Sequence, residues 1–269
     1  MKKIFNILTI FAIALFSACD TIDEDDRFIG PVEFTPKKNV LIEDFTGQKC
    51  LNCPTASEAV KSLQDLYGKE HIIAVAIHGG AMSMSMSTSN GIGLATETGE
   101  EYNKYWGIDS WPKGLVDRNA ANPAGGATNY TSWAAQVIQR LVEEPKVEIA
   151  VSDATYNADS LKLNIKVDLA TKDKLNGKVQ VWLTENNIVA LQALPSGGYD
   201  TKYVHNHVFR AAVNGEWGED VTLGKGEETS LNYTVDLNGQ KWVPENLAVV
   251  AFVYNEKEGV LQVVEQHVH

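Results

Sequence analysis

The chain has 269 residues, of which 44% are hydrophobic and 22% are charged, a composition typical of one large or two ordinary globular domains. With 35 acidic and 23 basic residues, its formal net charge at pH 7 is -12. Such an acidic chain repels phosphate, so nucleic acid and anionic lipid surfaces are poor candidates for partners. We therefore predict no nucleic-acid partner.

The first residues have the pattern of an export signal. The pair Lys2-Lys3 precedes an apolar stretch at Ile4–Phe16, which is too short to span a membrane as a helix. The segment Leu15–Cys19 then resembles a bacterial lipobox. This resemblance implies that residues 1–18 are a lipoprotein signal peptide and that Cys19 carries the lipid that attaches the protein to a membrane. A secretory signal followed by a chance cysteine is the alternative interpretation.

An acidic segment, Asp20–Arg27, follows the proposed lipid site. Its composition predicts a disordered tether over residues 19–37. The segment also resembles the acidic export signal that Bacteroides-type bacteria use to place lipoproteins on the outer cell surface, although a solvated spacer fits equally well. We expect an outer membrane lipoprotein of the cell envelope, and this resemblance extends the expectation to surface exposure.

Residues 38–144 alternate apolar strand-like runs with helical patterns. The expected elements are a strand at Val40–Phe45, a helix at Cys50–Tyr67, a strand at Ile72–Ile77, a helix at Glu97–Trp106, a strand at Gly114–Asp117 and a helix at Trp133–Glu143. The run at Ile72–Ile77 is apolar throughout, as a buried parallel strand requires. This order predicts helices packed on a central sheet.

From Pro145 onwards, strand-like runs recur with turns between them. Strands are expected at Lys146–Val151, Ser160–Ala170, Lys178–Glu185, Tyr203–Val213, Thr229–Asp236 and Leu247–Tyr254, with turns that include Asn176-Gly177 and Ser196–Gly198. The segment Leu161–Leu169 alternates apolar and polar residues, which predicts one buried and one solvent-facing side. We therefore predict an antiparallel β-sandwich of immunoglobulin-like type over residues 145–269.

Two cysteines, Cys50 and Cys53, lie where the first strand gives way to the first helix. The N–H groups at a helix N-terminus favour a thiolate, and the Cys-x-x-Cys spacing lets the second thiol reach the first. Because exported compartments are oxidising, the resting pair is expected to be a disulfide. This arrangement is typical of dithiol–disulfide chemistry, and no cofactor is predicted apart from the disulfide itself.

The segment 38–144 resembles the thioredoxin fold. Asp44 shortly before the cysteines, the Cys50-Leu51-Asn52-Cys53-Pro54 motif, and the Gly107–Gly114 segment with its proline carry this resemblance. It implies that Cys50 attacks as the thiolate, that Cys53 resolves the mixed disulfide, and that Asp44 takes the proton from Cys53. It also implies that Pro112 follows a cis peptide bond and lies against the cysteine pair.

The residues themselves leave other interpretations open. The sequence Gln48-Lys49 before the motif and Leu51-Asn52 within it differ from the usual thioredoxin residues, so the substrate is not specified. The cysteine pair could be a structural disulfide without turnover, and enzymatic activity therefore stays open. Asp44 could face solvent, and Pro112 could be an ordinary trans turn residue.

Methionines and histidines supply the remaining candidate ligands. Met82, Met84 and Met86 alternate close to His78, and their thioethers could bind Cu(I), although a flexible loop or a contact surface is the simpler interpretation. The pair His205 and His207 is expected to share one face of a strand, without an evident acidic third ligand for a metal.

Taken together, the chain resembles the outer membrane protein 28 family of Bacteroides-type lipoproteins. The lipobox, the Glu43–Gly47 segment before the cysteines, the Trp111-Pro112 pair and the Tyr203–Gly218 stretch carry this resemblance. Two functions are compatible with it. One is an exported thiol–disulfide oxidoreductase or redox sensor with a protein thiol client. The other is a surface binding or adhesion lipoprotein, in which the thioredoxin-like domain is a scaffold.

Overall fold

The computed structural model describes residues 34–85, 92–119 and 126–269. The chain divides into two units, Met1–Thr35 and Pro36–His269, and the first lies almost wholly outside the described residues.

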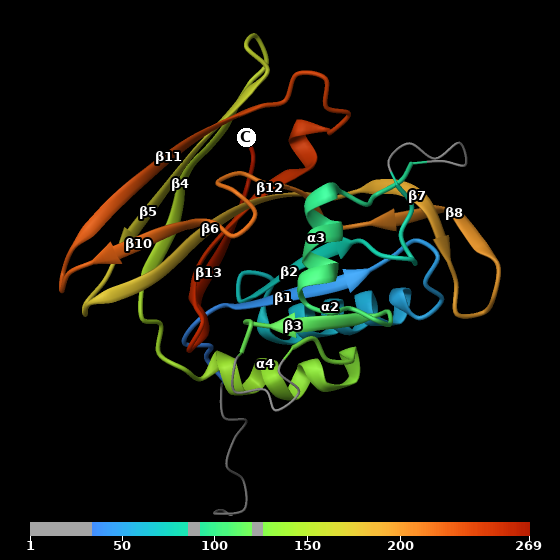
Figure 1. Cartoon of the computed structure of the whole chain (residues 1–269), viewed down its shortest axis with the longest axis horizontal. Helices are drawn as coiled ribbons and strands as arrows, with labels where there is room; N and C mark the ends of the chain where they lie inside the picture. Colours follow the sequence, from blue (N-terminus) through green and yellow to red (C-terminus); the bar gives the residue numbers. More distant parts are fainter. Residues whose placement is uncertain (1–33, 86–91, 120–125) are drawn as a thin grey trace, which may run out of the picture. The chain divides into compact units, whose positions relative to one another are not determined.

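The second unit is mostly β-structure with a few short helices (Figure 1). Its helices are α2 (Cys53–Tyr67), α3 (Glu97–Tyr105) and α4 (Trp133–Leu141), with short 3-10 turns at Tyr130–Ser132 and Pro244–Asn246. Its strands are β1 (Val40–Thr46), β2 (Ile72–His78), β3 (Lys113–Val116), β4 (Glu148–Asn157), β5 (Lys162–Ala170), β6 (Leu175–Glu185), β7 (Ile188–Ala193), β8 (Tyr199–His205), β9 (Val208–Ala212), β10 (Glu219–Leu223), β11 (Glu228–Asp236), β12 (Leu247–Asn255) and β13 (Gly259–His267).

One eight-stranded sheet runs through most of the unit. Its order is β13-β12-β6-β9-β2-β1-β3, with β10 paired to β6. Strands β1 and β2 are parallel, β1 and β3 are antiparallel, and β9 joins β2 in parallel where Val208 pairs with Ala76. The sheet therefore continues from the segment 38–144 into the segment 145–269, and both belong to one compact unit.

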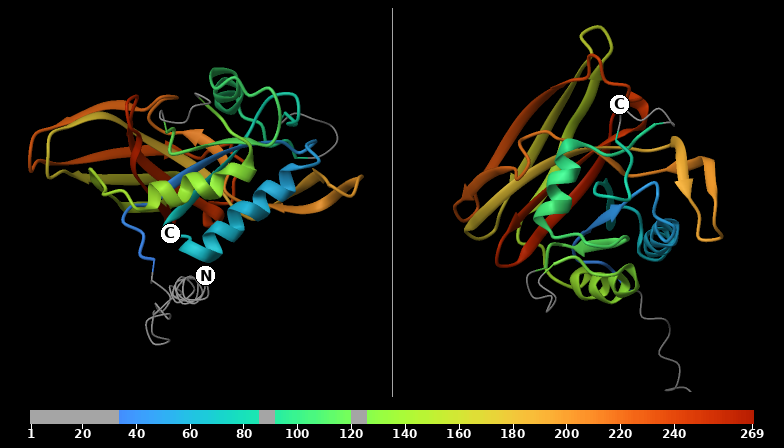
Figure 2. Two further views of the ribbon diagram at one scale, coloured as in Figure 1. Left: turned by 90° about the horizontal axis from the view of Figure 1, so that it is seen from below. Right: turned by 45° about the vertical axis from the view of Figure 1, so that its right-hand side comes forward.

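The apolar pattern of β1 and β2 explains the layers around them. Successive strand residues point to opposite faces. On one face, Leu41 and Phe45 pack in a core that contains Tyr102 of α3. On the other face, Val40 and Ile42 pack in a core that contains residues of α2 and α4. Figure 2 shows α3 on the side of the sheet opposite α2 and α4. Because side chains alternate along β1, Asp44 lies on the same face as Val40 and Ile42 and points towards α2.

A second sheet of three strands, β11-β5-β4, packs over the other end of the large sheet. The alternation predicted for Leu161–Leu169 is realised from Leu163 onwards, because Leu163, Ile165 and Val167 are all buried. These side chains share a core with residues of β6 and β12. A separate two-stranded hairpin, β7-β8, extends beside β1 and β2 and lies at the right of Figure 1.

Several sequence-based expectations differ from the structure. The predicted turn Asn176-Gly177 lies inside β6, where a Cβ atom on Gly177 would come within 2.6 Å of the Tyr254 carbonyl oxygen of the neighbouring strand. The glycine therefore allows β6 and β12 to lie close together and does not form a turn. The predicted strand Tyr203–Val213 is two strands, because the backbone turns at His207, whose φ is 55°. Strands β7, β10 and β13 were not predicted.

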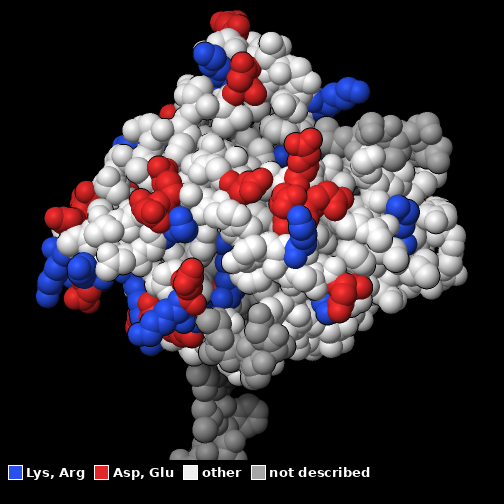
Figure 3. All heavy atoms as spheres, viewed as in Figure 1, with Lys and Arg blue, Asp and Glu red and all other residues white. Residues whose placement is uncertain are grey.

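The charged side chains are mixed in sign on the face drawn in Figure 3. Acidic and basic residues lie next to each other there, and the described part of that face has no extended basic area.

Candidate functional site

Cys50 and Cys53 form a disulfide at the start of α2. Their Cα atoms are 5.5 Å apart. Cys53 is the first residue of the helix and Pro54 follows it, a position where the missing proline N–H costs no helix hydrogen bond. The helix ends at Gly68, whose φ is 95°. The sequence motif is thus placed at a helix N-terminus, as predicted, and the pair is oxidised.

Both cysteines are buried, because the β7-β8 hairpin covers the loop before α2. Cys50 is 4% exposed and Cys53 is 1% exposed. The Gln192 side-chain amide donates to the Cys50 carbonyl oxygen over 2.9 Å. The Ala193 amide donates to the Gln48 carbonyl oxygen over 2.8 Å. The loop and the hairpin are therefore fixed to each other by hydrogen bonds between residues far apart in the sequence.

The Gln48 side chain makes a second set of hydrogen bonds that hold the cysteine loop in place. It is fully buried, and its side-chain oxygen accepts from the Leu94 amide over 3.0 Å. Its side-chain nitrogen donates to the carbonyl oxygens of Ile92 and Leu191. One side chain thus ties the cysteine loop to β7 and to the segment before α3. Neither Gln48 nor Gln192 was identified as a site residue from the sequence.

Asp44 is buried on β1, not solvent-facing. It is 4% exposed, and its Oδ1 atom has no hydrogen-bond partner among the described residues. Burial raises the pKa of Asp44 to about 7, because a charged carboxylate loses its hydration there. Asp44 and Cys53 line the same cleft. A carboxyl group with this pKa can both accept and release a proton near neutral pH.

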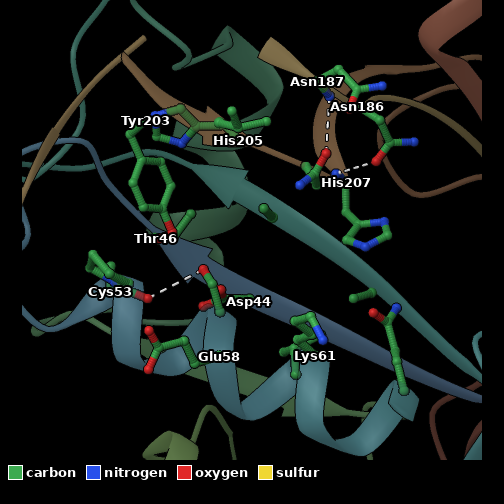
Figure 4. Close-up of a pocket in the computed structure, with 18 of the residues that line it drawn as sticks. Asp44, Thr46, Cys53, Glu58, Lys61, Asn186, Asn187, Tyr203, His205 and His207 are labelled. Carbon is green, nitrogen blue, oxygen red and sulfur yellow. Dashed lines mark hydrogen bonds between the residues drawn. The ribbon is translucent and has the colours of Figure 1, made fainter. Parts of the chain in front are cut away.

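Histidines from separate strands meet in the same cleft (Figure 4). His78 at the end of β2 and His205 at the end of β8 have their ring centroids 5.6 Å apart. Burial lowers the pKa of His205 to about 4, and burial together with the neighbouring His205 lowers that of His78 well below its usual value. His205 and His207 do not share one strand face as predicted, because the chain turns between them, yet both line the cleft.

The Trp111–Pro112 peptide bond is cis, as the resemblance implied. Pro112 is buried just before β3, although it does not line the cleft that contains Asp44 and Cys53. The Trp111 ring donates from Nε1 to Asn103 Oδ1 over 3.2 Å. The same ring lies close to Gly80, where an added Cβ would come within 2.2 Å of it.

A family model for outer membrane protein Omp28 matches residues 99–269. The chain belongs to the Omp28 family. This membership assigns it to the outer membrane or the wider cell envelope. The match begins after Cys50 and Cys53, so it includes the hairpin that covers the disulfide but not the cysteine motif itself.

One solved structure shows a similar fold over most of the chain. HBP35 of Porphyromonas gingivalis is 16% identical, with a TM-score of 0.65, and the match covers 87% of this chain and 76% of that one. Sporulation control protein Spo0M from Bacillus subtilis is 14% identical, with a TM-score of 0.30, over 47% of this chain and 49% of that one. A TM-score of 0.30 does not indicate a shared fold. No curated protein sequence matched significantly.

The methionine segment of this Omp28-family protein is only partly described. Met84 is buried and Met82 is 37% exposed, while Met86 lies outside the described residues. Within residues 34–85, 92–119 and 126–269, no group of three or more His, Cys, Asp or Glu side chains is arranged to hold a metal ion. The copper site at these methionines and His78 stays a prediction.

The lipid site lies outside the described part of the chain. Cys19 and the signal-like residues before it belong to the undescribed segment 1–33. Within the described residues, no helix is long and apolar enough to cross a membrane.

Proposed function

We propose that this Omp28-family protein is a lipid-anchored envelope protein with a reversible dithiol–disulfide centre at Cys50 and Cys53. The observation that carries the proposal is the burial of Asp44, whose Oδ1 atom has no hydrogen-bond partner among the described residues and which lines the same cleft as Cys53. An unpartnered buried carboxyl group costs stability, about 1–3 kcal/mol or more. A purely structural disulfide does not need this cost, whereas a redox pair needs a proton acceptor.

The reaction is exchange with an external thiol. A thiolate attacks one sulfur of the Cys50–Cys53 bond, forms a mixed disulfide with it and expels the other sulfur as a thiolate. A second external thiol then releases the mixed disulfide. Two electrons pass from the two external thiols to the pair, which yields one external disulfide and two protein thiols. Asp44 supplies the proton to the Cys53 thiolate in this direction and accepts it in the reverse direction.

The β7-β8 hairpin controls access to this centre. With Cys50 only 4% exposed, a folded client cannot reach either sulfur in this conformation. Reaction with a protein thiol therefore requires the hairpin to separate from the cysteine loop, whereas a small thiol needs a smaller opening. The protein is thus expected to react much faster with small thiols than with protein thiols.

The architecture supports a thioredoxin-like origin for residues 38–144. The parallel β1-α2-β2 unit carries the cysteines at the start of its helix, and the cis proline precedes an antiparallel strand, β3. In residues 145–269, the sheet β11-β5-β4 shares a core with β6 and β12, an arrangement compatible with an antiparallel sandwich. On this proposal, the sandwich strands have joined the thioredoxin-like sheet through β9.

A second candidate function is ligand binding with an inert disulfide. The burial of both cysteines favours it, because an inaccessible disulfide resists exchange. The reduction potential decides between the two. The full chain in detergent is equilibrated with dithiothreitol redox buffers, and free thiols are counted by alkylation and mass spectrometry. A potential above about -300 mV supports reversible exchange, whereas a lower value indicates a structural disulfide and overturns the redox proposal.

Lipid attachment at Cys19 accounts for membrane association of a chain with no spanning helix among its described residues. The Cys19→Ser variant is expected to lose labelling by radioactive palmitate and to leave the membrane fraction. The Cys50→Ser variant is the matched control and should keep both properties. Palmitate labelling of the Cys19→Ser variant at the wild-type level would contradict the anchor.

A further inference from the structure

A cleft of about 580 Å³ lies between α2 and the chain segments around β8, β9 and β13. Its volume is within the range of small-molecule sites, about 300–1,000 Å³. Asp44, Thr46 and His78 belong to the strands at its base, and His205, His207 and Glu265 come from the strands opposite α2. In Figure 4, Tyr203 extends from β8 towards Thr46 and the start of α2.

Three side chains that are more than nine-tenths buried leave polar atoms unpartnered in this cleft. They are Asp44, His78 and His205, which are 4%, 3% and 5% exposed. Asp44 Oδ1, both ring nitrogens of His78 and His205 Nε2 have no hydrogen-bond partner among the described residues. Folded proteins leave few such atoms without a hydrogen-bond partner. Their gathering in one cleft indicates a surface built to meet a polar ligand.

The same property recurs at the other end of the cleft. His207 Nδ1 and Glu265 Oε1 have no hydrogen-bond partner among the described residues, and they lie 4.0 Å apart, too far for a direct hydrogen bond. The side chains of His207 and Glu265 are 25% and 14% exposed. A ligand that satisfies both ends must therefore carry several polar groups along its length.

The protonation of His205 and His78 specifies which polar groups are needed. Burial lowers the pKa of His205 to about 4, so its ring is neutral at pH 7, and its Nε2 atom has no hydrogen-bond partner among the described residues. Neutral His78 has one donor and one acceptor nitrogen, both without partners. The ligand must donate to some of these atoms and accept from another. A hydroxyl group does both from a single atom.

The charges around the cleft disfavour an anionic ligand. Arg210, the cation beside His205, is held by Glu185 at 2.7 Å, and Lys61, which lines the cleft from α2, is paired with Asp65 at 2.5 Å. Lys69, also in the lining, is exposed. Asp44 and Glu265, by contrast, place carboxyl groups at the unpartnered positions. A neutral ligand fits this combination of uncharged imidazoles and carboxyl groups better than a phosphate or a carboxylate.

We propose that this cleft is a binding site for a neutral, polyhydroxylated ligand of sugar size. Hydroxyl groups at one end of the ligand hydrogen-bond to Asp44, His78 and His205, and those at the other end hydrogen-bond to His207 and Glu265. The Tyr203 ring, half-buried at the side of the cleft, supplies an apolar surface for the carbon skeleton. This site goes beyond the redox proposal and requires no change in the disulfide.

The test is calorimetric titration of the oxidised full chain in detergent with glucose, galactose, mannose, N-acetylglucosamine and maltose. At least one of these sugars should bind at millimolar concentration or below. The His205→Gln variant should weaken that binding by about tenfold or more, since it replaces a ring nitrogen at a fixed position with a more flexible amide. The matched control is His71→Gln, a half-buried histidine that pairs with Asn39 outside the cleft, and it should bind as the wild type does.

Two results would overturn the proposal. One is that none of the five sugars binds at 10 mM, including the case in which an amine cation, with spermidine as the probe, binds instead. The other is equal affinity of the wild type and the His205→Gln variant for the sugar. Histidine ring signals in the NMR spectrum of the wild-type protein provide a readout that does not depend on the folding of a variant, because those of His78 and His205 should shift on binding. The titration uses no thiol, so its failure leaves the reduction-potential test unaffected.

Discussion

The Gln192 side-chain amide donates to the Cys50 carbonyl oxygen over 2.9 Å, although 142 residues separate them in the chain. Gln192 also donates to the Gly47 carbonyl oxygen, over 3.4 Å. One buried side chain from β7 thus satisfies two carbonyl groups of the loop that carries the disulfide. The burial of the cysteines is therefore a property of the hairpin as much as of the Cys-x-x-Cys motif.

The Gln192→Ala variant should loosen this cover and expose the disulfide. Loss of the amide leaves the buried carbonyl group of Cys50 without its partner, which we expect to lower the free energy of unfolding by about 1–3 kcal/mol. The rate of disulfide reduction by a small thiol, measured by alkylation after quenching, should rise.

The control for Gln192→Ala is Gln180→Ala. Gln180 is also fully buried and donates to a carbonyl oxygen, that of Gly215, over 2.9 Å, but it belongs to β6 and does not contact the cysteine loop. It should lose similar stability without faster reduction. Equal reduction rates in the two variants at the same residual stability would contradict the role of the hairpin as a cover.

Asp44→Asn should make stability less dependent on pH. In the wild type, burial raises the pKa of Asp44 to about 7, whereas an unfolded aspartate titrates near 3.9. Below about pH 4 both states are protonated, and the stabilising effect of the protonated form is fully present. Between pH 4 and pH 7 only the unfolded state releases its proton, so the wild-type free energy of unfolding falls, by about 4 kcal/mol in total.

Asparagine does not ionise, so the variant should gain stability relative to the wild type as pH rises from 4 to 8. Urea unfolding at pH 4, 6 and 8 measures this difference. Burial also raises the pKa of Glu265 to about 7, so Glu265 lowers the free energy of unfolding over the same pH range. This contribution is present in both proteins and cancels in their difference. A constant difference for Asp44→Asn would place its carboxyl group in solvent.

The cysteine site could be predicted in part from the sequence because its signals are local. An apolar strand, a Cys-x-x-Cys motif and a helix that ends at Gly68 are consecutive in the chain, and the structure reproduces their order and approximate bounds. Asp44 was identified from the resemblance of the segment before Cys50 to the thioredoxin fold. Its burial depends on which face of β1 meets α2, and the local sequence is compatible with either a buried or a solvent-facing Asp44.

The cleft could not be predicted because its residues meet only through the fold. His78 ends β2 and His205 ends β8, and nothing near either residue indicates the other. The strand-like run Tyr203–Val213 predicts one long strand. Tertiary pairing overrides it, since the His207 carbonyl oxygen accepts from the Ala76 amide at 2.8 Å and the chain turns at a positive φ to do so. Such long-range pairing has no local signal.

Gly80→Ala should destabilise the protein more than Gly107→Ala. Both glycines have a positive φ, 69° and 60°, which alanine adopts at a cost of about 1–2 kcal/mol. A Cβ atom at Gly80 would also come within 2.2 Å of the Trp111 ring, whereas a Cβ at Gly107 meets nothing within 4 Å. The second variant thus isolates the backbone cost. Urea unfolding measures both, and equal losses would mean that the Trp111 ring moves aside freely.

Glu43→Gln should be strongly destabilising, because Glu43 neutralises a cation that is surrounded by aromatic rings. Arg118 donates from Nε and Nη2 to the two carboxylate oxygens over 2.9 and 2.8 Å, and both side chains are at most 3% exposed. The Arg118 guanidinium carbon also lies 4.5 Å from the centre of the Tyr254 ring and 5.4 Å from that of Trp182. This ion pair joins β1 to the aromatic core beneath β6 and β12.

Removing one charge leaves the Arg118 guanidinium uncompensated, which typically costs about 3–5 kcal/mol for a buried pair. Urea unfolding at pH 7 should show this loss. Lys61→Gln breaks the exposed Lys61–Asp65 pair of α2 and should cost less than about 1 kcal/mol. Because Glu43 and Asp44 are adjacent on β1 but point to opposite faces, Glu43→Gln should leave the pH dependence attributed to Asp44 unchanged at its lower stability. Loss of that pH dependence would mean that the two faces of the sheet are coupled.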